Sequence, residues 1–185
     1  MSKIIIPSVI LTIDIHGFRN ITFVVTNMDG TILALSSVSK LFATNYEIRK
    51  KCVETADILI RNYKVDTIIM EDNQLFIDKI DRFPDPYVMR NIVLGFGVKT
   101  AIEDKFLETV DYILEYPEHD WRTKVLSPAV KYSIDLYKSH VKIKDISEDF
   151  MKIIDDGNYY KAVCLSECVN YKSLRKEKYL VDYIW

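Results

Sequence analysis

Apolar residues fall into short runs near the N-terminus and into stretches of helical periodicity further along the chain. The first three runs are rich in β-branched residues and are separated by turn residues, of which the Asp29–Gly30 pair is a strong hairpin signal. This pattern predicts an antiparallel meander of three strands, at Val9–Ile15, Asn20–Thr26 and Thr31–Val38.

After the meander, helical and strand patterns alternate. The clearest helix is predicted over Thr44–Tyr63, because its apolar residues recur at helical spacing with basic residues opposite them. Its apolar side consists of Ile48, Cys52, Ala56, Leu59 and Tyr63. A second helix is predicted from Pro86 to about Glu103, with an inward side made of Val88 or Met89, Ile92, Val93 and Phe96. The remaining predicted elements are strands at Thr67–Glu71 and Val110–Glu115 and helices from Pro128 to about Tyr137 and from near Asp156 to Lys172.

The predicted elements follow one another as three strands, a helix, a strand, a helix, a strand and further helices. No repeat, low-complexity tract or linker interrupts the 185 residues, so we expect a single domain over residues 1–185. Parallel pairing across the helical crossovers gives an α/β fold with a mixed five-stranded sheet, three antiparallel strands followed by parallel strands, flanked by helices. This is the element order of the ribonuclease-H-like fold, in which the first and fourth strands are neighbours.

Two of the predicted strands end on a single carboxylate, Asp14 in VILTIDIHG and Glu71 in DTIIMEDNQ. A buried strand gains nothing from a carboxylate inside it, so a charge at its end indicates a site. A third acidic cluster, Asp155 and Asp156, comes late in the chain. Magnesium prefers hard oxygen ligands, and two ions about 3.5–4 Å apart can clamp a phosphodiester, so this set suits a metal-dependent nuclease. The alternative is that the strand acids end at solvated loops and that Asp155 and Asp156 cap a helix.

The net charge and the basic clusters limit where a DNA-binding surface could lie. The formal net charge is −2, so any surface that binds DNA has to be local. The densest basic groups are Arg49, Lys50 and Lys51 in the first predicted helix and Lys172, Arg175, Lys176 and Lys178 near the C-terminus.

Three cysteines, Cys52, Cys164 and Cys168, form no close CxxC pair, which is typical of reduced thiols in an intracellular protein. The apolar run at the N-terminus is short and is broken by Pro7, so we expect neither a membrane span nor a signal peptide. An intracellular location follows, in the cytoplasm or at a viral replication site if the source is viral.

Four segments together resemble the RuvC-like Holliday junction resolvases, including their poxvirus and phage branches. They are TIDIHG with the first-strand acid, IIMEDNQ with the acid after strand four, EYPEHDWRTKVL beyond strand five, and DDGNYYKAVCLSE in the last helix. The resemblance implies a magnesium-dependent endodeoxyribonuclease, with manganese as a possible substitute, that resolves four-way DNA junctions by paired nicks as a homodimer.

The same resemblance implies roles for individual residues. Asp14 would bridge two metal ions, Glu71 would bind one of them, and Asp155 or Asp156 would complete the site. Lys124, together with Arg122, would lie near the scissile phosphate and stabilise developing charge.

The sequence departs from the family where two aspartates are expected in the last helix. Asn158 and Lys161 stand at those positions, and a protonated lysine repels a metal ion. Two readings stay open: Asp155 and Asp156 replace the missing ligands from one turn earlier, or the chain is a DNA-binding or structural subunit of this fold that does not cut. A third is a nuclease for other substrates, such as flaps or RNA–DNA hybrids.

Overall fold

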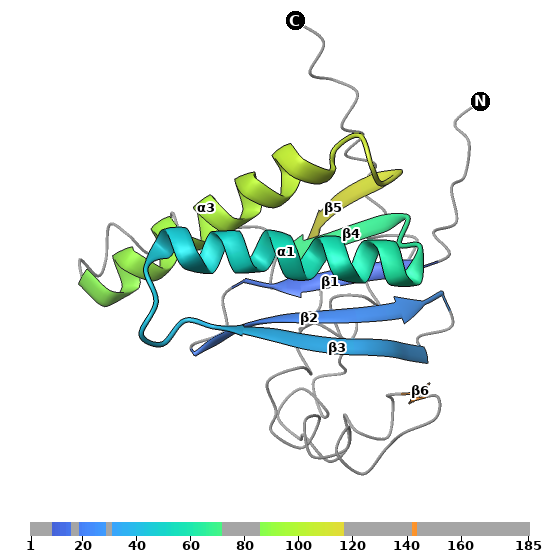
Figure 1. Ribbon diagram of the computed structural model, residues 1–185, viewed down its shortest axis with the longest axis horizontal. Coiled ribbons are helices and arrows are strands. Elements are labelled where there is room, and N and C mark those ends of the chain that lie inside the picture. The colour runs from blue at the N-terminus through green and yellow to red at the C-terminus, as the bar shows by residue number, and fades with distance from the viewer. Residues whose placement is uncertain (1–8, 16–18, 29–30, 72–85, 117–141, 144–185) are drawn as a thin grey trace, which may run out of the picture.

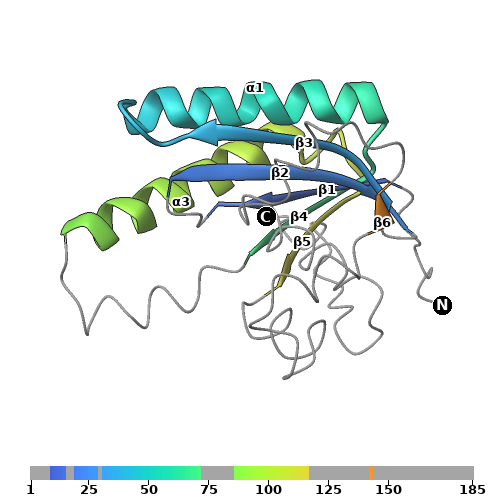
Figure 2. The same cartoon turned by 90° about the horizontal axis from the view of Figure 1, so that it is seen from below.

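A computed structural model describes residues 9–15, 19–28, 31–71, 86–116 and 142–143 of the chain. Within them, a mixed sheet carries two helices on one of its faces (Figures 1 and 2). The strands are β1 (Val9–Asp14), β2 (Asn20–Asn27), β3 (Thr31–Ser39), β4 (Thr67–Glu71), β5 (Tyr112–Tyr116) and β6 (Lys142–Ile143), and the helices are α1 (Asn45–Tyr63) and α3 (Pro86–Phe106).

The order of the strands across the sheet is β5-β4-β1-β2-β3-β6. The pairs β1–β2 and β2–β3 are antiparallel, whereas β4 is parallel to β1 and β5 is parallel to β4. The predicted sheet of three antiparallel strands followed by parallel strands is therefore confirmed. The two-residue strand β6 extends it by pairing parallel to β3. The helices predicted near Pro128–Tyr137 and Asp156–Lys172 lie outside the described residues.

Helix α1 begins and ends at defined signals in the sequence. The side chain of Thr44 accepts a hydrogen bond from the backbone N–H of Glu47 (3.2 Å), and the Glu47 carboxylate accepts one from the backbone N–H of Thr44 (2.7 Å). This capping box satisfies backbone donors that a first helical turn leaves open. At the other end, Lys64 adopts a left-handed conformation (φ 53°), and its N–H bonds to the carbonyl of Ile60.

The main core lies between the helices and the sheet. It contains alternate residues of the central strands, such as Leu11, Ile13 and Met70, together with the buried sides of both helices. The buried residues of α1 are Ile48, Cys52, Ala56, Leu59 and Ile60, which confirms four of the five positions predicted for it, while Tyr63 is exposed. Burial raises the pKa of the Cys52 thiol to about 12, so this thiol is a packing group.

The inward side predicted for α3 is partly wrong. Ile92 is buried, but Val93 is 58% exposed and Phe96 37% exposed. The buried side of the helix continues instead through Leu94, Val98, Ile102 and Phe106. Apolar residues lie on more than one side of α3, so spacing alone could not select the side that packs on α1 and the sheet.

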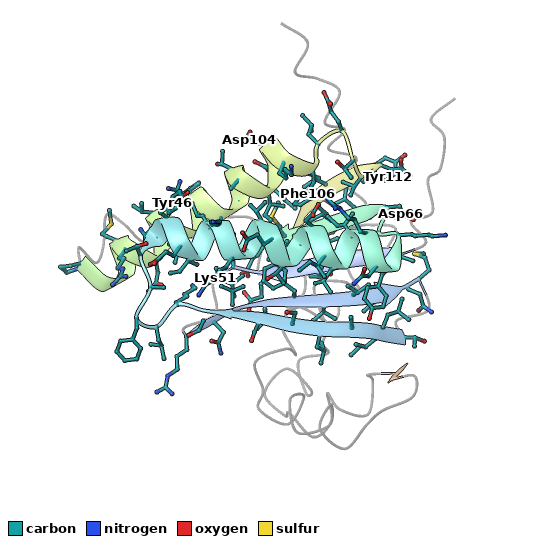
Figure 3. The ribbon with its side chains drawn as sticks, viewed as in Figure 1. Tyr46, Lys51, Asp66, Asp104, Phe106 and Tyr112 are labelled. Atoms are coloured by element: carbon teal, nitrogen blue, oxygen red, sulfur yellow. The ribbon has the colours of Figure 1, made fainter. Side chains whose placement is uncertain are left out.

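Asp66 fixes the alignment of three parallel strands at their N-terminal end (Figure 3). Its N–H donates to the carbonyl of Val9 (3.1 Å), and its carboxylate accepts from the N–H of Val9 (3.3 Å) and the hydroxyl of Thr67 (2.8 Å). Its own carbonyl accepts from the N–H groups of Asp111 (2.8 Å) and Tyr112 (3.1 Å). The start of β4 is thereby joined to β1 on one side and to β5 on the other.

Candidate active site

The register of β1 and β4 brings Asp14 and Glu71 side by side. The two strands are parallel, and Ile13 lies opposite Met70, so the next residue of each strand is the carboxylate that ends it. Residues at matching positions of neighbouring strands point to the same face, and the strands lie about 4.8 Å apart. The two carboxylates are therefore close enough to share one small cation.

Both acids point to the face of the sheet opposite the helices. Ile13 and Met70, which precede them, belong to the core under α1 and α3, and successive side chains of a strand alternate between faces. Asp14 is 3% exposed and Glu71 is 1% exposed. Two buried neighbouring carboxylates are unfavourable unless positive charge or protons compensate them, which suits a site built for a cation.

A row of oxygen-bearing side chains crosses four strands at this level. Thr22 of β2 lies opposite Asp14, and Tyr116 of β5 lies opposite Glu71. Thr12 precedes Asp14 by two positions on the same face of β1. The hydroxyls of Thr12 and Thr22 are buried and make no hydrogen bond within the described part of the chain. They are available to a ligand or water beside the carboxylates.

Sequence analysis missed Thr12, Thr22 and Tyr116 as members of this row. The spacing of Thr12 and Asp14 by two residues was a signal for a shared face. The positions of Thr22 and Tyr116 depend on strand register, which the sequence pattern did not give.

A lysine lies at the same end of β1. The ammonium group of Lys40 donates a hydrogen bond to the carbonyl of Ile15, the residue after Asp14, at 2.9 Å. The backbone N–H of Lys40 also donates to the carbonyl of Arg19, just before β2, at 2.8 Å. The segment after β3 is thus fastened to the end of the sheet that carries the acids.

The other predicted site residues, Asp155, Asp156 and Lys124, lie outside the described residues, as do Asn158 and Lys161. Within the residues that are described, no group of three or more His, Cys, Asp or Glu side chains gathers around a point. Asp14 and Glu71 supply two hard oxygen ligands of the kind that magnesium prefers.

A separate acidic pair lies on the helix side of the sheet. Glu115 of β5 is paired in register with Met70 and bonds to Lys99 of α3 at 2.7 Å. Burial raises the pKa of Glu103, which lies one turn after Lys99. The charge of Glu115 and a hydrogen bond to Glu115 raise this pKa further, whereas the charge of Lys99 lowers it. This group ties α3 to the sheet and is separate from the Asp14–Glu71 pair.

No protein-family model and no curated protein sequence matches the chain. Among solved structures, it is similar to a Thermus thermophilus RuvC structure, with 11% identity, a TM-score of 0.60, and coverage of 85% of this chain and 90% of that one. It is also similar to T. thermophilus RuvC in complex with a Holliday junction substrate, with 10% identity, a TM-score of 0.56, and coverage of 85% and 91%.

Among the described residues, no helix combines the length and the apolar character that crossing a bilayer requires.

At 10–11% identity, the likeness to RuvC is a likeness of architecture. Together with the sheet order, it shows that the chain has the ribonuclease-H-like fold.

Proposed function

We propose that the chain is a metal-dependent, structure-selective endonuclease that resolves four-way DNA junctions by paired nicks. The observation that carries the proposal is the buried pair of Asp14 and Glu71, which end neighbouring parallel strands on one face of the sheet. The similarity of the fold to a RuvC structure in complex with a Holliday junction supports branched DNA as the substrate class.

In this proposal the chain's own residues hold the metal and the substrate in place. Asp14 and Glu71 are ligands on central strands, whose backbone hydrogen bonds keep the two carboxylates at a fixed spacing. Asp155 or Asp156 would complete a site for two magnesium ions, and Lys124 would stabilise charge at the scissile phosphate. When bound, magnesium supplies an activated water and neutralises the departing 3′ oxygen.

Paired nicks on opposite strands of a junction need two copies of the site. We therefore propose that the chain works as a homodimer. Sedimentation velocity, with and without a four-way junction, tests this assembly, and a complex with one copy per junction would contradict it.

Cleavage of an end-labelled four-way junction tests the proposal most directly. The parent protein should produce symmetric nicks with magnesium or manganese and none with EDTA, and Asp14→Asn should remove them. Asp104→Asn is the matched control, because it makes the same change at an exposed carboxylate of α3 (Figure 3) and should cleave like the parent. Flap, RNA–DNA hybrid and plain duplex substrates, run in parallel, show which structure is preferred.

Asn158 and Lys161 favour a second candidate, a subunit that binds branched DNA without cutting it. Tight junction binding with no nick in either metal would select it. Equal cleavage by the parent and by Asp14→Asn would instead remove the carboxylate pair from the reaction.

A further inference from the structure

Phe42, in the loop between β3 and α1, combines two unusual properties. Its backbone is left-handed (φ 56°), and its side chain is 106% exposed. Left-handed backbone is unfavourable for a bulky L-residue, and residues with such strain cluster at functional sites. The described residues contain one other non-glycine residue with positive φ, Lys64, and that residue ends α1. Phe42 instead lies in a turn and ends no helix.

The loop that carries Phe42, Lys40–Thr44, is held at both ends. Lys40 is bonded to the carbonyls of Ile15 and Arg19, and Thr44 is held in the capping box of α1. Between them, the carbonyl of Ala43 accepts a hydrogen bond from the Arg90 guanidinium of α3 at 3.3 Å. The ring of Phe42 is therefore presented to solvent by an anchored backbone.

Basic residues are frequent in the sequence around this exposed ring. Lys40–Lys51 contains four basic residues and one acidic residue, although the whole chain has a formal charge of −2. Arg19 and Arg90, both exposed, are tied to the loop by the hydrogen bonds described above. Two more apolar side chains, Leu41 (53%) and Tyr46 (66%), are also exposed. Exposed aromatic rings among cations are the chemistry that binds unstacked bases and their phosphates.

The loop lies at the end of the sheet where the candidate carboxylates lie. The Lys40 ammonium group reaches the carbonyl of the residue that follows Asp14. Figures 1 and 2 show β3 leading into α1 at the end of the sheet where β2 begins. The loop and the carboxylates thus share one end of the sheet, while the carboxylates point to the face opposite the helices.

We propose that the Lys40–Thr44 loop is a base-stacking element, in which Phe42 stacks on an unpaired base of branched DNA and Arg19 contacts an adjacent phosphate. The inference rests on the proposed function, since it places the loop at the same end of the sheet as a DNA-cutting site. It deepens that function by assigning recognition of the unstacked bases to a named side chain.

Binding in EDTA, where the DNA is not cut, tests the role of Phe42. The probes are a fluorescent four-way junction with unpaired bases at its centre and an intact duplex of the same length. Phe42→Ala should weaken binding to the junction by roughly 5- to 150-fold and leave duplex binding unchanged, because one base stacked on an aromatic side chain contributes on that scale. Phe42→Trp should bind like the parent. Ile58→Ala is the matched control, since Ile58 is 58% exposed on α1 outside the loop.

Two further measurements separate stacking from other contacts. 2-Aminopurine at the unpaired position should be quenched by the parent and by Phe42→Trp, but not by Phe42→Ala. Arg19→Gln should lower the salt dependence of binding by about one phosphate contact, whereas Lys105→Gln, at the far end of α3, should not. Circular dichroism of each variant verifies that the fold is intact.

The outcomes distinguish this inference from the proposed function. Junction cleavage by the parent together with unchanged binding by Phe42→Ala overturns the stacking role alone. An equal loss of junction and duplex binding also overturns it, as does a change in oligomeric state without a change in DNA affinity. A parent protein that neither binds nor cuts branched DNA overturns both proposals.

Discussion

Replacing Asp14 by asparagine should stabilise the protein in the absence of metal, although it should abolish cleavage. Asp14 and Glu71 are buried at neighbouring register positions. Two unit charges about 5 Å apart, as on adjacent strands, repel by about 3 kcal/mol at an effective dielectric constant of about 20. Asparagine has nearly the same shape and no charge, so part of this repulsion is relieved.

We expect Asp14→Asn to raise the free energy of unfolding in EDTA by about 1–3 kcal/mol, because the amide keeps only part of the carboxylate's hydrogen bonding. In a chain of this size, that corresponds to an increase in Tm of roughly 2–12 °C. Magnesium should narrow the difference between the two proteins and then reverse it as its concentration rises. A ligand at one hundred times its Kd stabilises the native state by about 2.7 kcal/mol, and only the parent retains both carboxylates.

The assay is thermal unfolding followed by circular dichroism, in EDTA and in a magnesium series, for the parent, Asp14→Asn and the exposed control Asp104→Asn. The control should follow the parent in every buffer. A lower Tm for Asp14→Asn in EDTA would refute the idea that charge repulsion dominates at this pair. A parent Tm that does not change with magnesium would refute the metal site.

Three further substitutions test other parts of the fold by equilibrium unfolding. In the folded state the pKa of Glu103 is raised, so its stabilising contribution is complete below the ordinary carboxyl pKa and is lost as the pH rises through the raised value. Glu103→Gln should remove this dependence in a series from pH 4 to 7, because the amide can still donate to Glu115. Lys64→Gly should raise the free energy of unfolding by about 1 kcal/mol, since glycine adopts positive φ without strain. Thr44→Ala should lower it by about 1 kcal/mol through loss of the capping box.

Each of these three predictions has a result that would contradict it, and the prediction for Lys64→Gly has a matched control. An unchanged pH dependence in Glu103→Gln would show that another group titrates. Asn62→Gly, inside α1, should lower the free energy of unfolding by roughly 0.3 kcal/mol, because glycine is a poorer helix former than asparagine. A change of the same sign for Asn62→Gly and Lys64→Gly would argue against conformational strain at Lys64. A Thr44→Ala variant as stable as the parent would show that water replaces the cap.

The sheet was predictable because its strands carry local signals and because their order leaves few ways to pair. The strand with Asp14 is apolar on both faces, as a central strand should be, and the Asp29–Gly30 pair marks a hairpin. The ends of the elements were less predictable. Val110 was assigned to strand five, but its N–H bonds to the carbonyl of Phe106, so the strand begins at Tyr112.

Only part of the candidate site was predictable, because some of its residues are brought together by the alignment between strands. A lone carboxylate at the end of an apolar strand stands out in a sequence, so Asp14 and Glu71 could be selected and their neighbouring positions inferred from the fold. Thr22 and Tyr116 do not stand out, because their place beside the acids depends on register between strands. The roles of Asp155, Asp156 and Lys124 stay predictions from the resemblance.

The hydrogen bonds of Asp66 have a consequence for residues far from them. They set the alignment of β1, β4 and β5. Asp66 precedes Glu71 by five residues, which at about 3.3 Å per residue places the two about 16 Å apart. A slip of β4 by one residue would place Met70 beside Asp14 and carry the Glu71 carboxylate into the helix-side core. A substitution at Asp66 can thus damage the carboxylate pair without touching it, and the chemistry at one end of the sheet depends on hydrogen bonds at the other.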